Sequence, residues 1–358
     1  MLKSFLLQKL KRKMKMTEGS KNTTKEQLMA AIAPEVAKIE QTMRQDLSDV
    51  TNGADPLLSE VLDYGIFNGG KRLRPLLVVL AARLCGLSKE NKNNQSIYEL
   101  AIAFEYLHGA TLFHDDVIDC ADMRRGKLSV NKKFGVIAAI LGGDFLHSRS
   151  MFIVGTRGGA AALKIFCHAT NAMVDGEFLQ LRNAQNYNLS KDDYFAAVKG
   201  KTALLIAATC EIGALIGGAT NIQQQALAEY GISLGTAFQI VDDLLDYQGD
   251  SAKTGKAVGN DFQEGKMTLP LILALGAANS VDRKRLLFLL ENEDARKSGF
   301  AEACKLIEKY DGFATSRNKA ESIVAEAVAG LSIFQNEEGL AAFGILKALA
   351  AYVLAREK

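Results

Sequence analysis

Two clusters of aspartates with the same spacing are the part of this sequence best suited to chemistry. The chain carries DDVID at 115–119 and DDLLD at 242–246. The six carboxylates are Asp115, Asp116, Asp119, Asp242, Asp243 and Asp246. Residues four apart share one face of a helix, so each cluster holds like charges together at a cost in helix stability. A hard divalent cation would offset this repulsion, and a solvated acidic face would rarely have such apolar neighbours. The pattern predicts carboxylate sites for Mg²⁺.

The expected partner of these sites is a phosphorylated small molecule. Mg²⁺ held by few carboxylates keeps open positions, which substrate phosphate oxygens usually fill. Basic residues that suit phosphate stand near the clusters or beside Gly69-Gly70. They are Lys71, Arg72, Arg74, Arg124, Arg125, Lys201, Lys256 and Lys266, with Thr202 beside Lys201. Taken singly, each Lys or Arg is more often a solvated surface charge.

Helical spacing adds two polar residues to the candidate site. His108 is seven residues before Asp115, which places it on nearly the same helix face two turns away. Gln239, Asp242 and Asp246 fall at i, i+3 and i+7 and form one stripe. A lone His is more often a core residue than a ligand, and only its place on this face makes the two interpretations about equal, so this assignment stays open. The His114-Asp115 pair resembles the HD step of metal-dependent phosphohydrolases, which keeps a hydrolase as an alternative.

Successive helices must position these residues. Apolar periodicity predicts helices separated by short polar breaks, with a Gly-rich loop at 248–266 and shorter helices from Thr268 onward. The predicted helices cover 28–47, 57–67, 75–87, 98–119, 130–154, 160–181, 191–216 and 223–247. No fixed repeat and no Pro- or Ser-rich linker divides the chain, which indicates one large helical domain.

Composition restricts the class of protein. The 358 residues are 48% hydrophobic and 7% aromatic, with four Pro and no Trp, which disfavours a strand-rich sandwich and favours helices. A net charge of +2 lacks the basic excess typical of nucleic-acid binders. Five cysteines without a CxxC pair indicate neither a disulfide framework nor a zinc site, and favour a reducing cytoplasm. No uninterrupted apolar run is long enough for a membrane helix, so we expect a soluble protein.

The first fifteen residues differ from the rest of the chain. Their six Lys or Arg and absence of acids give +6, which leaves −4 for the remainder of a chain of net charge +2. A short basic amphipathic helix here would allow weak contact with an anionic membrane surface. The alternatives are a disordered tail, or a misplaced start with Met14 or Met16 as the true one. We therefore separate a basic and polar extension, 1–24, from a single all-α domain, 25–358.

Seven motifs, in order, resemble those of the trans-isoprenyl diphosphate synthases, or polyprenyl synthetases. They are GGKRLRP (69–75), LHGATLFHDDVID (107–119), MRRG (123–126), GDFL (143–146), KT (201–202), FQIVDDLLD (238–246) and GKAVGNDFQEGKMTLP (255–270). Any one is weak, but together they extend the resemblance over about residues 30–350. The resemblance implies an all-α isoprenoid-synthase bundle, with its aspartate-rich helices facing each other across a deep central cavity. It also implies three Mg²⁺ ions and a homodimer.

The resemblance implies roles for the candidate residues. Asp115, Asp119 and Asp242 would hold Mg²⁺ against the diphosphate of an allylic substrate such as farnesyl diphosphate, supported by Asp116, Asp243 and Asp246. The residues around that diphosphate would be Arg124, Lys201, Thr202, Gln239, Lys256 and Lys266. The pocket for isopentenyl diphosphate would consist of Lys71, Arg74, His108 and Arg125. Those counted as catalytic are Asp115, Asp119, Arg124, Lys201, Asp242 and Lys256.

Product length is set in this family by the residues at the fifth and fourth positions before the first aspartate. Here these are Ala110 and Thr111, whose small side chains leave the cavity open. We therefore expect a long product of roughly C35–C50 for a quinone side chain, because an open cavity admits a longer chain. The alternatives are a short-chain farnesyl or geranylgeranyl synthase, a non-catalytic partner subunit and an HD-type phosphohydrolase. The expected location is the cytoplasm, with peripheral contact at the inner membrane face left open.

Overall fold

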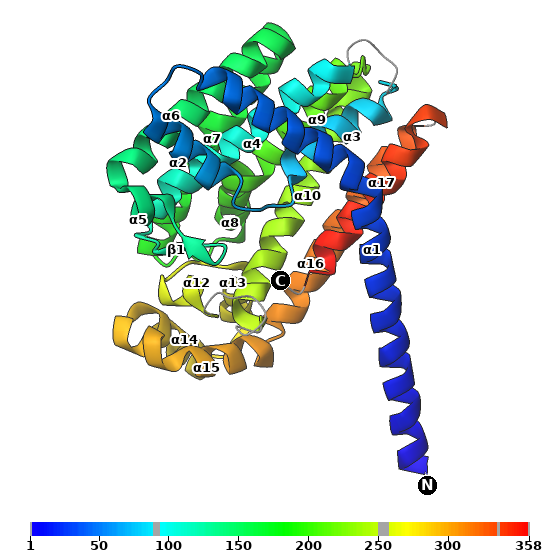
Figure 1. Ribbon diagram of the computed structural model, residues 1–358. Helices are drawn as coiled ribbons and strands as arrows, with labels where there is room; N and C mark the ends of the chain where they lie inside the picture. Colours follow the sequence, from blue (N-terminus) through cyan, green and yellow to red (C-terminus); the bar gives the residue numbers. More distant parts are fainter. Residues whose placement is uncertain (1, 89–93, 250–257, 335–336, 357–358) are drawn as a thin grey trace.

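The structure is a bundle of helices. The computed structural model describes residues 2–88, 94–249, 258–334 and 337–356. Within these ranges nearly all residues are helical, and the strands form one two-residue hairpin (Figure 1). This confirms the all-α prediction.

The helices differ widely in length, and α12 to α15 form the lower part of the molecule in Figure 1. The first half of the chain forms α1 Leu2–Val50, α2 Pro56–Ile66, α3 Leu73–Leu84, α4 Asn94–Ile118, β1 Met123–Arg124, β2 Lys127–Leu128, α5 Val130–Phe134, α6 Val136–Ile153, the π segment η1 Val154–Gly158 and α7 Gly159–Gln185. The second half forms α8 Lys191–Val198, the π segment η2 Lys199–Ala203, α9 Leu204–Ile216, α10 Asn221–Gln248, α12 Asn260–Gln263, α13 Leu269–Ala277, α14 Ser280–Glu291, α15 Glu293–Lys309, α16 Gly312–Gly330, η3 Leu331–Ile333, η4 Glu337–Gly339 and α17 Leu340–Leu354.

The central helix of the core is α4. Its residues 100–107 are all buried, because α3, α6 and α9 pack around it. Phe104 on α4 meets Phe166 on α7 edge to face, with ring centroids 5.3 Å apart and both side chains fully buried. The apolar surface removed from water around α4 is the main favourable contribution to the stability of this region. The core therefore fixes α4, whose C-terminal end carries the first aspartate cluster.

The structure corrects the sequence prediction at three points where the backbone leaves helical geometry. Residues 130–154, predicted as one helix, form α5 and α6 because Gly135 has φ +91°. The connection after α4, expected to be a loop, contains the β1–β2 hairpin, with Met123 opposite Leu128 and Arg124 opposite Lys127. The third departure is the widening of the predicted helix 191–216 to π geometry at η2. The hairpin contains the candidate residues Arg124 and Arg125, and η2 contains Lys201. Gly135 directly precedes α6.

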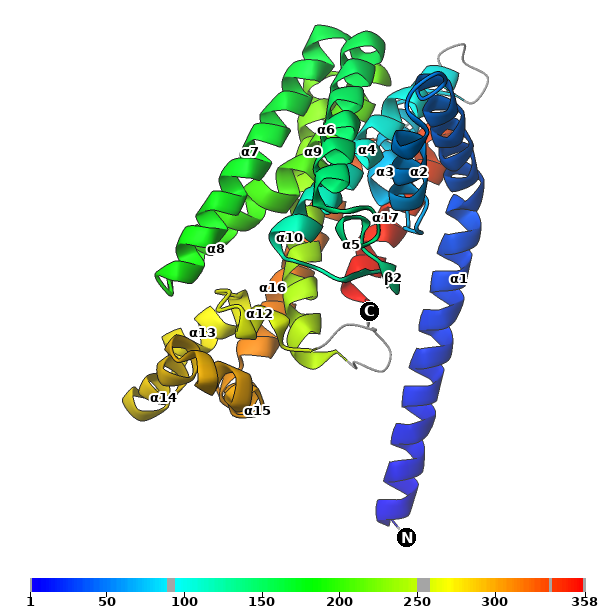
Figure 2. The same ribbon diagram turned by 60° about the vertical axis from the view of Figure 1, so that its left-hand side comes forward.

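The first helix extends well beyond the bundle. Figures 1 and 2 both show the N-terminal half of α1 projecting away from the other helices. Residues 2–24 have helical backbone continuous with the part of α1 that packs on α3, α4 and α17. A helix is one of the two conformations that the sequence left open for this extension. The single-domain assignment of 25–358 and any contact of residues 1–24 with a membrane stay predictions.

Many apolar side chains of the segment from α6 to α7 are exposed to solvent, and α7 runs along one edge of the molecule (Figure 2). By length and composition the stretch Val136–Gln185 could cross a membrane, since its most apolar window has a mean hydropathy of 1.3. The sequence analysis found no span there because scattered charged residues interrupt the run. The exposed members are Val136, Ile137, Ile140, Leu141, Met151, Phe152, Val174, Phe178 and Leu181. An apolar surface of this extent typically marks an interaction surface.

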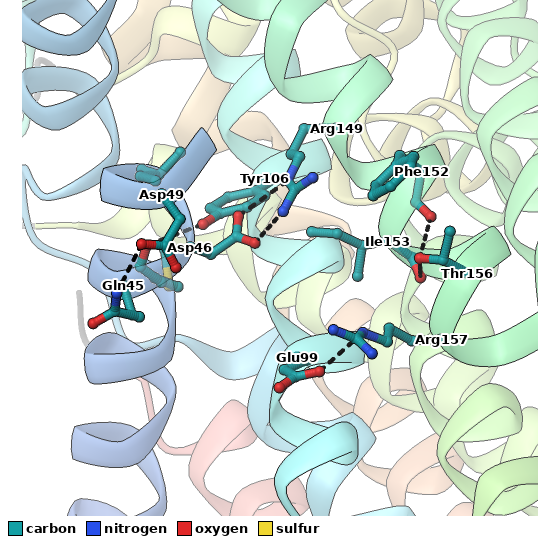
Figure 3. Close-up of polar contacts among 12 residues, drawn as sticks. Gln45, Asp46, Asp49, Glu99, Tyr106, Arg149, Phe152, Ile153, Thr156 and Arg157 are labelled. Atoms are coloured by element: carbon teal, nitrogen blue, oxygen red, sulfur yellow. Dashed lines mark hydrogen bonds and ion pairs between the residues drawn. The ribbon is translucent and has the colours of Figure 1, made fainter. Parts of the chain in front are cut away.

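A polar groove lies between α1, α6 and the N-terminal end of α4, the end opposite to the first aspartate cluster. Figure 3 shows Arg149 of α6 directed at Asp46 of α1, and Arg157 directed at Glu99 of α4. A cavity of about 450 Å³ lies among these side chains. The Arg149 and Asp46 side chains are only 20% and 16% exposed, whereas those of Arg157 and Glu99 are 53% and 30% exposed. The first pair is therefore the one expected to matter for stability, since exposed pairs contribute little.

Replacing Asp46 by Asn should destabilise the protein by about 1–3 kcal/mol, because the half-buried Arg149 guanidinium loses its charged acceptor. Glu99→Gln is the matched control and should cost less than about 1 kcal/mol, as for other exposed ion pairs. Urea unfolding at neutral pH measures both. Equal losses for the two variants would contradict this account of the groove.

Candidate active site

The first aspartate cluster lies where α4 leaves the core. Asp119 N donates to Asp115 O at 2.8 Å, so the helical turn continues through the cluster. Asp119 is exposed, Asp115 is half-buried and Asp116 is buried. Burial raises the pKa of Asp115 to about 6, with Glu177 adding to the rise and Lys201 opposing it. The cluster therefore has a further carboxylate and a cation as its neighbours from other helices.

The β1–β2 hairpin brings two arginines back to this end of the bundle. Arg125 and Gly126 have φ of +52° and +78°, as the two central residues of a type I′ turn require. Arg124 donates from Nε to Asp116 Oδ1 at 2.8 Å and also from Nη2. Arg125 lies on the other side and donates from Nη1 to Gly69 O. Adjacent arginines thus serve the aspartate cluster and the Gly-Gly break respectively.

The second cluster, on α10, divides into exposed and buried carboxylates. Asp242 is exposed, whereas Asp243 is buried and accepts hydrogen bonds from Tyr194 Oη at 2.6 Å and Gln239 Nε2 at 2.9 Å. Burial raises the pKa of Asp243 to about 7. Both Asp243 oxygens therefore have protein partners, and this residue supports the site from inside. Asp246 is half-buried, and burial raises its pKa to about 6.

The chain after α10 folds back onto the second cluster. Asp261 N donates to Asp246 Oδ2 at 3.0 Å, and Lys266 Nζ lies 3.1 Å from Asp261 Oδ1. Lys266, one of the sequence-predicted site residues, is thus linked to the second cluster through Asp261. Lys256 lies outside the described residues.

The π segment η2 connects the two clusters. Lys201 Nζ donates to Gln180 Oε1 at 2.7 Å and lies 2.7 Å from Glu177 Oε1, both on α7. Thr202 Oγ1 donates to Gln239 Oε1 at 3.2 Å, on the stripe that carries the second cluster. Lys201 also acts on the charge of the first cluster. One widened turn therefore presents neighbouring side chains to both acidic sites, as π segments at functional sites often do.

Glycines allow η2 to approach α7 closely enough for this arrangement. A Cβ added to Gly176 would lie 2.3 Å from Lys201 N, and one added to Gly200 would lie 2.8 Å from Ala172 O. Both contacts are with backbone atoms, which cannot move aside as a flexible side chain could. The position of Lys201 over Glu177 depends on this close packing.

A separate cationic cavity of about 350 Å³ lies between α3, α4, α10 and α17. The sequence-predicted residues Lys71, Arg74, His108 and Arg125 all line it. The Nε atom of Arg74 is buried without a hydrogen-bond partner among the described residues. Burial, with the charges of Arg74 and Arg125, holds the pKa of His108 well below its usual range. A neutral imidazole and several guanidinium and ammonium groups suit a diphosphate.

The C-terminal helix completes the wall of this cationic cavity, which the sequence analysis missed. Lys71 Nζ donates to Tyr352 Oη at 2.7 Å. Arg356 lies 3.2 Å from Asp242 Oδ1 and over the ring of Phe238, with 4.1 Å to the centroid. A motif search could not find these contacts, because the partners are more than a hundred residues apart in the chain.

Other missed residues do have a signal in the sequence. Glu177 and Gln180 fall at i and i+3 on α7, and both accept from Lys201. Glu105 is three residues before His108 on α4 and lines the cationic cavity with it. Helical spacing alone could have added these residues. The two positions expected to control product length precede the first cluster: Ala110 is buried, and half-buried Thr111 donates from Oγ1 to His108 O at 2.9 Å.

The donor set fits a hard divalent cation shared with a phosphate ligand. Asp115, Asp119 and Asp242 offer carboxylate oxygens on the exposed side of each cluster. Within the described part of the chain, no three His, Cys, Asp or Glu side chains converge to enclose a metal ion. Mg²⁺ is commonly held in this way, by one or two carboxylates with substrate phosphates completing its coordination.

Comparison with known proteins gives the same family at several levels. The sequence model of the polyprenyl synthetase family matches residues 55–307. Octaprenyl diphosphate synthase of Haemophilus influenzae is 35% identical over 306 residues, which is 85% of this chain and 90% of that protein. Geranylgeranyl diphosphate synthase of Saccharolobus solfataricus is 35% identical over 249 residues, which is 68% of this chain and 74% of that protein.

Solved structures agree in fold with this chain. The polyprenyl synthase of Caulobacter crescentus, crystallised with calcium and isoprenyl diphosphate, superposes with a TM-score of 0.81 at 33% identity, over 92% of this chain and 97% of that one. The fold is therefore the all-α isoprenoid synthase fold. The chain belongs to the polyprenyl synthetase family and is a trans-prenyl diphosphate synthase.

Proposed function

We propose that this chain lengthens an allylic diphosphate, such as farnesyl diphosphate, by successive head-to-tail condensation with isopentenyl diphosphate. The product expected is roughly C35–C50, for a quinone side chain, because the small residues below the first cluster leave the cavity open to a long chain. The observation that carries the proposal is the presence of two different sites that could each hold a diphosphate, the first through bound cations and the second directly. One is acidic with exposed carboxylates, and the other is the cationic cavity lined by Lys71, Arg74 and Arg125.

The acidic site is proposed to bind the allylic diphosphate. Asp115, Asp119 and Asp242 would hold Mg²⁺, three ions per site, which would supply positive charge against the departing diphosphate. Arg124, Lys201 and the other basic residues of this site would stabilise the same developing charge. Preorganised charges of this kind lower the barrier to a step that separates charge. Cleavage of the allylic C–O bond then leaves the electron pair on the diphosphate.

The cationic cavity is proposed to orient isopentenyl diphosphate. Its double bond attacks the allylic carbon, a C–C bond forms, and a proton is lost to the released diphosphate. The product retains one diphosphate and gains five carbons. His108, neutral because its pKa is held low, would donate one hydrogen bond without adding charge. Fixing two diphosphates at set positions supplies the proximity that the bond-forming step needs.

Product length is the part of the proposal with a specific alternative. The relatives include an octaprenyl and a geranylgeranyl synthase at the same 35% identity. Neither Ala110 nor Thr111 carries a bulky side chain, which supports the longer product. The short-chain alternative would require another part of the cavity to stop elongation.

A homodimer is also proposed. If a second copy of the chain covers the apolar edge, no membrane is needed to cover it, and this supports a cytoplasmic location. The exposed apolar side chains of α6 and α7 fall at helical spacing, as in Ile137 with Leu141, and Val174 with Phe178. A second copy that covers this edge would remove them from water. The charge of the 1–15 segment leaves peripheral contact with an anionic membrane as a separate expectation.

Purified protein incubated with farnesyl diphosphate, labelled isopentenyl diphosphate and Mg²⁺ should yield a ladder of products that ends in the long-chain range. EDTA should abolish incorporation, because the exposed carboxylates cannot hold a diphosphate without cations. Chromatography of the dephosphorylated products gives their lengths. Products that stop at C20 would support the short-chain alternative, and no incorporation by folded protein would argue for a non-catalytic subunit.

Thr111→Phe should shorten the product to C20 or less while incorporation continues, because a ring one turn below Asp115 would close the cavity. Thr111→Ser is the matched control and should leave the product length unchanged. The comparison uses the same chromatographic assay. A long product from Thr111→Phe would place the growing chain along another wall.

Ile137→Asp should convert the proposed dimer into a monomer, because a charge would have to be buried in an apolar interface. Ile222→Asp is the control, since Ile137 is 75% exposed and Ile222, at the start of α10, is 73% exposed. Light scattering after size-exclusion chromatography gives the mass of each variant. Dissociation by Ile222→Asp, or a dimer that survives Ile137→Asp, would exclude this edge as the interface.

A further inference from the structure

Arg72 is a buried charge that the proposed function does not use. It lies between Lys71 and Arg74 in the loop after Gly69-Gly70, yet only 3% of its surface is exposed. Its backbone is left-handed, with φ +49°, which costs free energy for a residue with a side chain. Surrounding contacts must therefore hold it in place.

The guanidinium of Arg72 joins three elements. Nε donates to Glu40 Oε1 on α1 at 3.2 Å, and Nη1 donates to Glu105 Oε1 on α4 at 2.8 Å. Nη2 donates to Ile66 O, at the end of α2, at 3.0 Å. Each of its three nitrogens thus has a protein acceptor, and the planar fork geometry of Arg suits this better than the point charge of Lys.

These contacts bear on the cationic cavity because Arg72 directly follows Lys71 and lies two residues before Arg74, and the side chains of Lys71 and Arg74 line the cavity. The backbone that carries Lys71 and Arg74 is fixed to α4 wherever Arg72 is bound to Glu105. Glu105 is itself buried and is the one carboxylate among the described residues that line the cavity. Its charge acts on Arg74 and Arg125 in the direction that keeps both protonated, against the effect of burial.

We propose that Arg72 and Glu105 are positioning residues of the cavity for isopentenyl diphosphate. The buried pair anchors to α4 the segment that carries Lys71, together with the first turn of α3, which carries Arg74. Arg72 is not itself a ligand of the diphosphate. This deepens the proposed function and rests on its assignment of the cavity. The Glu40 bond adds a weaker tie to α1, since the Glu40 side chain is 42% exposed.

Loss of Glu105 has two physical effects, which change the affinity of the cavity for an anion in opposite directions. Removing a negative charge from a cationic cavity would, by electrostatics alone, tighten the binding of an anion. Loss of the anchor would loosen the loop and weaken binding, because small displacements of positioned groups reduce rates strongly. The proposal requires the second effect to dominate.

Arg72→Lys keeps the charge but cannot make the three bonds. It should raise the KM for isopentenyl diphosphate about tenfold, a shift well within what displaced binding groups cause. The KM for farnesyl diphosphate should stay within about twofold of wild type, since Arg124 and Lys201 are untouched. Glu105→Gln should give the same asymmetric change. Glu99→Gln, on the same helix in the polar groove, is the control and should change neither KM.

A double variant and a binding measurement still test the proposal if the single variants fold poorly. Arg72→Met with Glu105→Met replaces the buried pair by apolar side chains of similar size, which often preserves folding. Calorimetry of inorganic pyrophosphate binding in EDTA then reports the cationic cavity without turnover. The double variant should bind pyrophosphate about tenfold more weakly than wild type, as expected for a lost positioning contact.

Three results would overturn the proposal. They are a double variant that binds pyrophosphate as tightly as wild type, a Glu105→Gln variant that binds it more tightly, and an equal rise of both KM values in Arg72→Lys. These outcomes are distinct from failure of the proposed function. In that case the wild-type protein itself would show no incorporation, while the pyrophosphate comparison would still test the anchor.

Discussion

The repulsion between like charges is the constraint on which the rest of this structure depends. Two acidic clusters and a group of basic side chains lie at one end of the bundle, and none of these groups is stable at close quarters without compensation. The structure supplies it with partners from the protein: Arg124 for Asp116, the Asp261 amide for Asp246, and Glu105 for Arg72. Exposed Asp242 has Arg356 as its partner, whereas exposed Asp119 is left to be balanced by ligands. The division between balanced and unbalanced charges defines the site.

Rigid backbone features keep these partners in register. The core fixes α4, close glycine contacts fix η2 against α7, and the type I′ hairpin fixes the two arginines. Arg72, Cys120 and Arg125 all have left-handed backbone, and all three lie beside the acidic or cationic groups. Backbone conformations of this kind persist only where surrounding contacts determine them. At these three residues, the free-energy cost of left-handed backbone is therefore incurred where the geometry of charged groups has to be held.

The long helices and the motif residues could be predicted from the sequence, because both follow from local spacing. The range 223–247 was predicted and α10 covers Asn221–Gln248, since apolar periodicity and few breakers leave little choice. The hairpin was missed because positive φ at Arg125, a residue other than glycine, has no sequence signal. The pairing of Tyr194 with Asp243, or of Arg356 with Asp242, was missed for a different reason. These contacts join residues 49 and 114 positions apart, which only the packing of the bundle brings together.

The two anion sites differ in what they need, and this difference bears on repeated elongation. On the proposed function, the acidic site needs cations from solution before it accepts a diphosphate, whereas the cationic cavity already has its charge in place. On the proposed function, each condensation leaves the lengthened product's diphosphate in the cavity and frees the acidic site. A further cycle then requires that diphosphate to leave the cavity, so the cavity must not bind it too strongly. The carboxylate of Glu105 lowers the positive potential there while it anchors Arg72. One buried acid can thus fix the geometry of the cavity and limit its hold on the product.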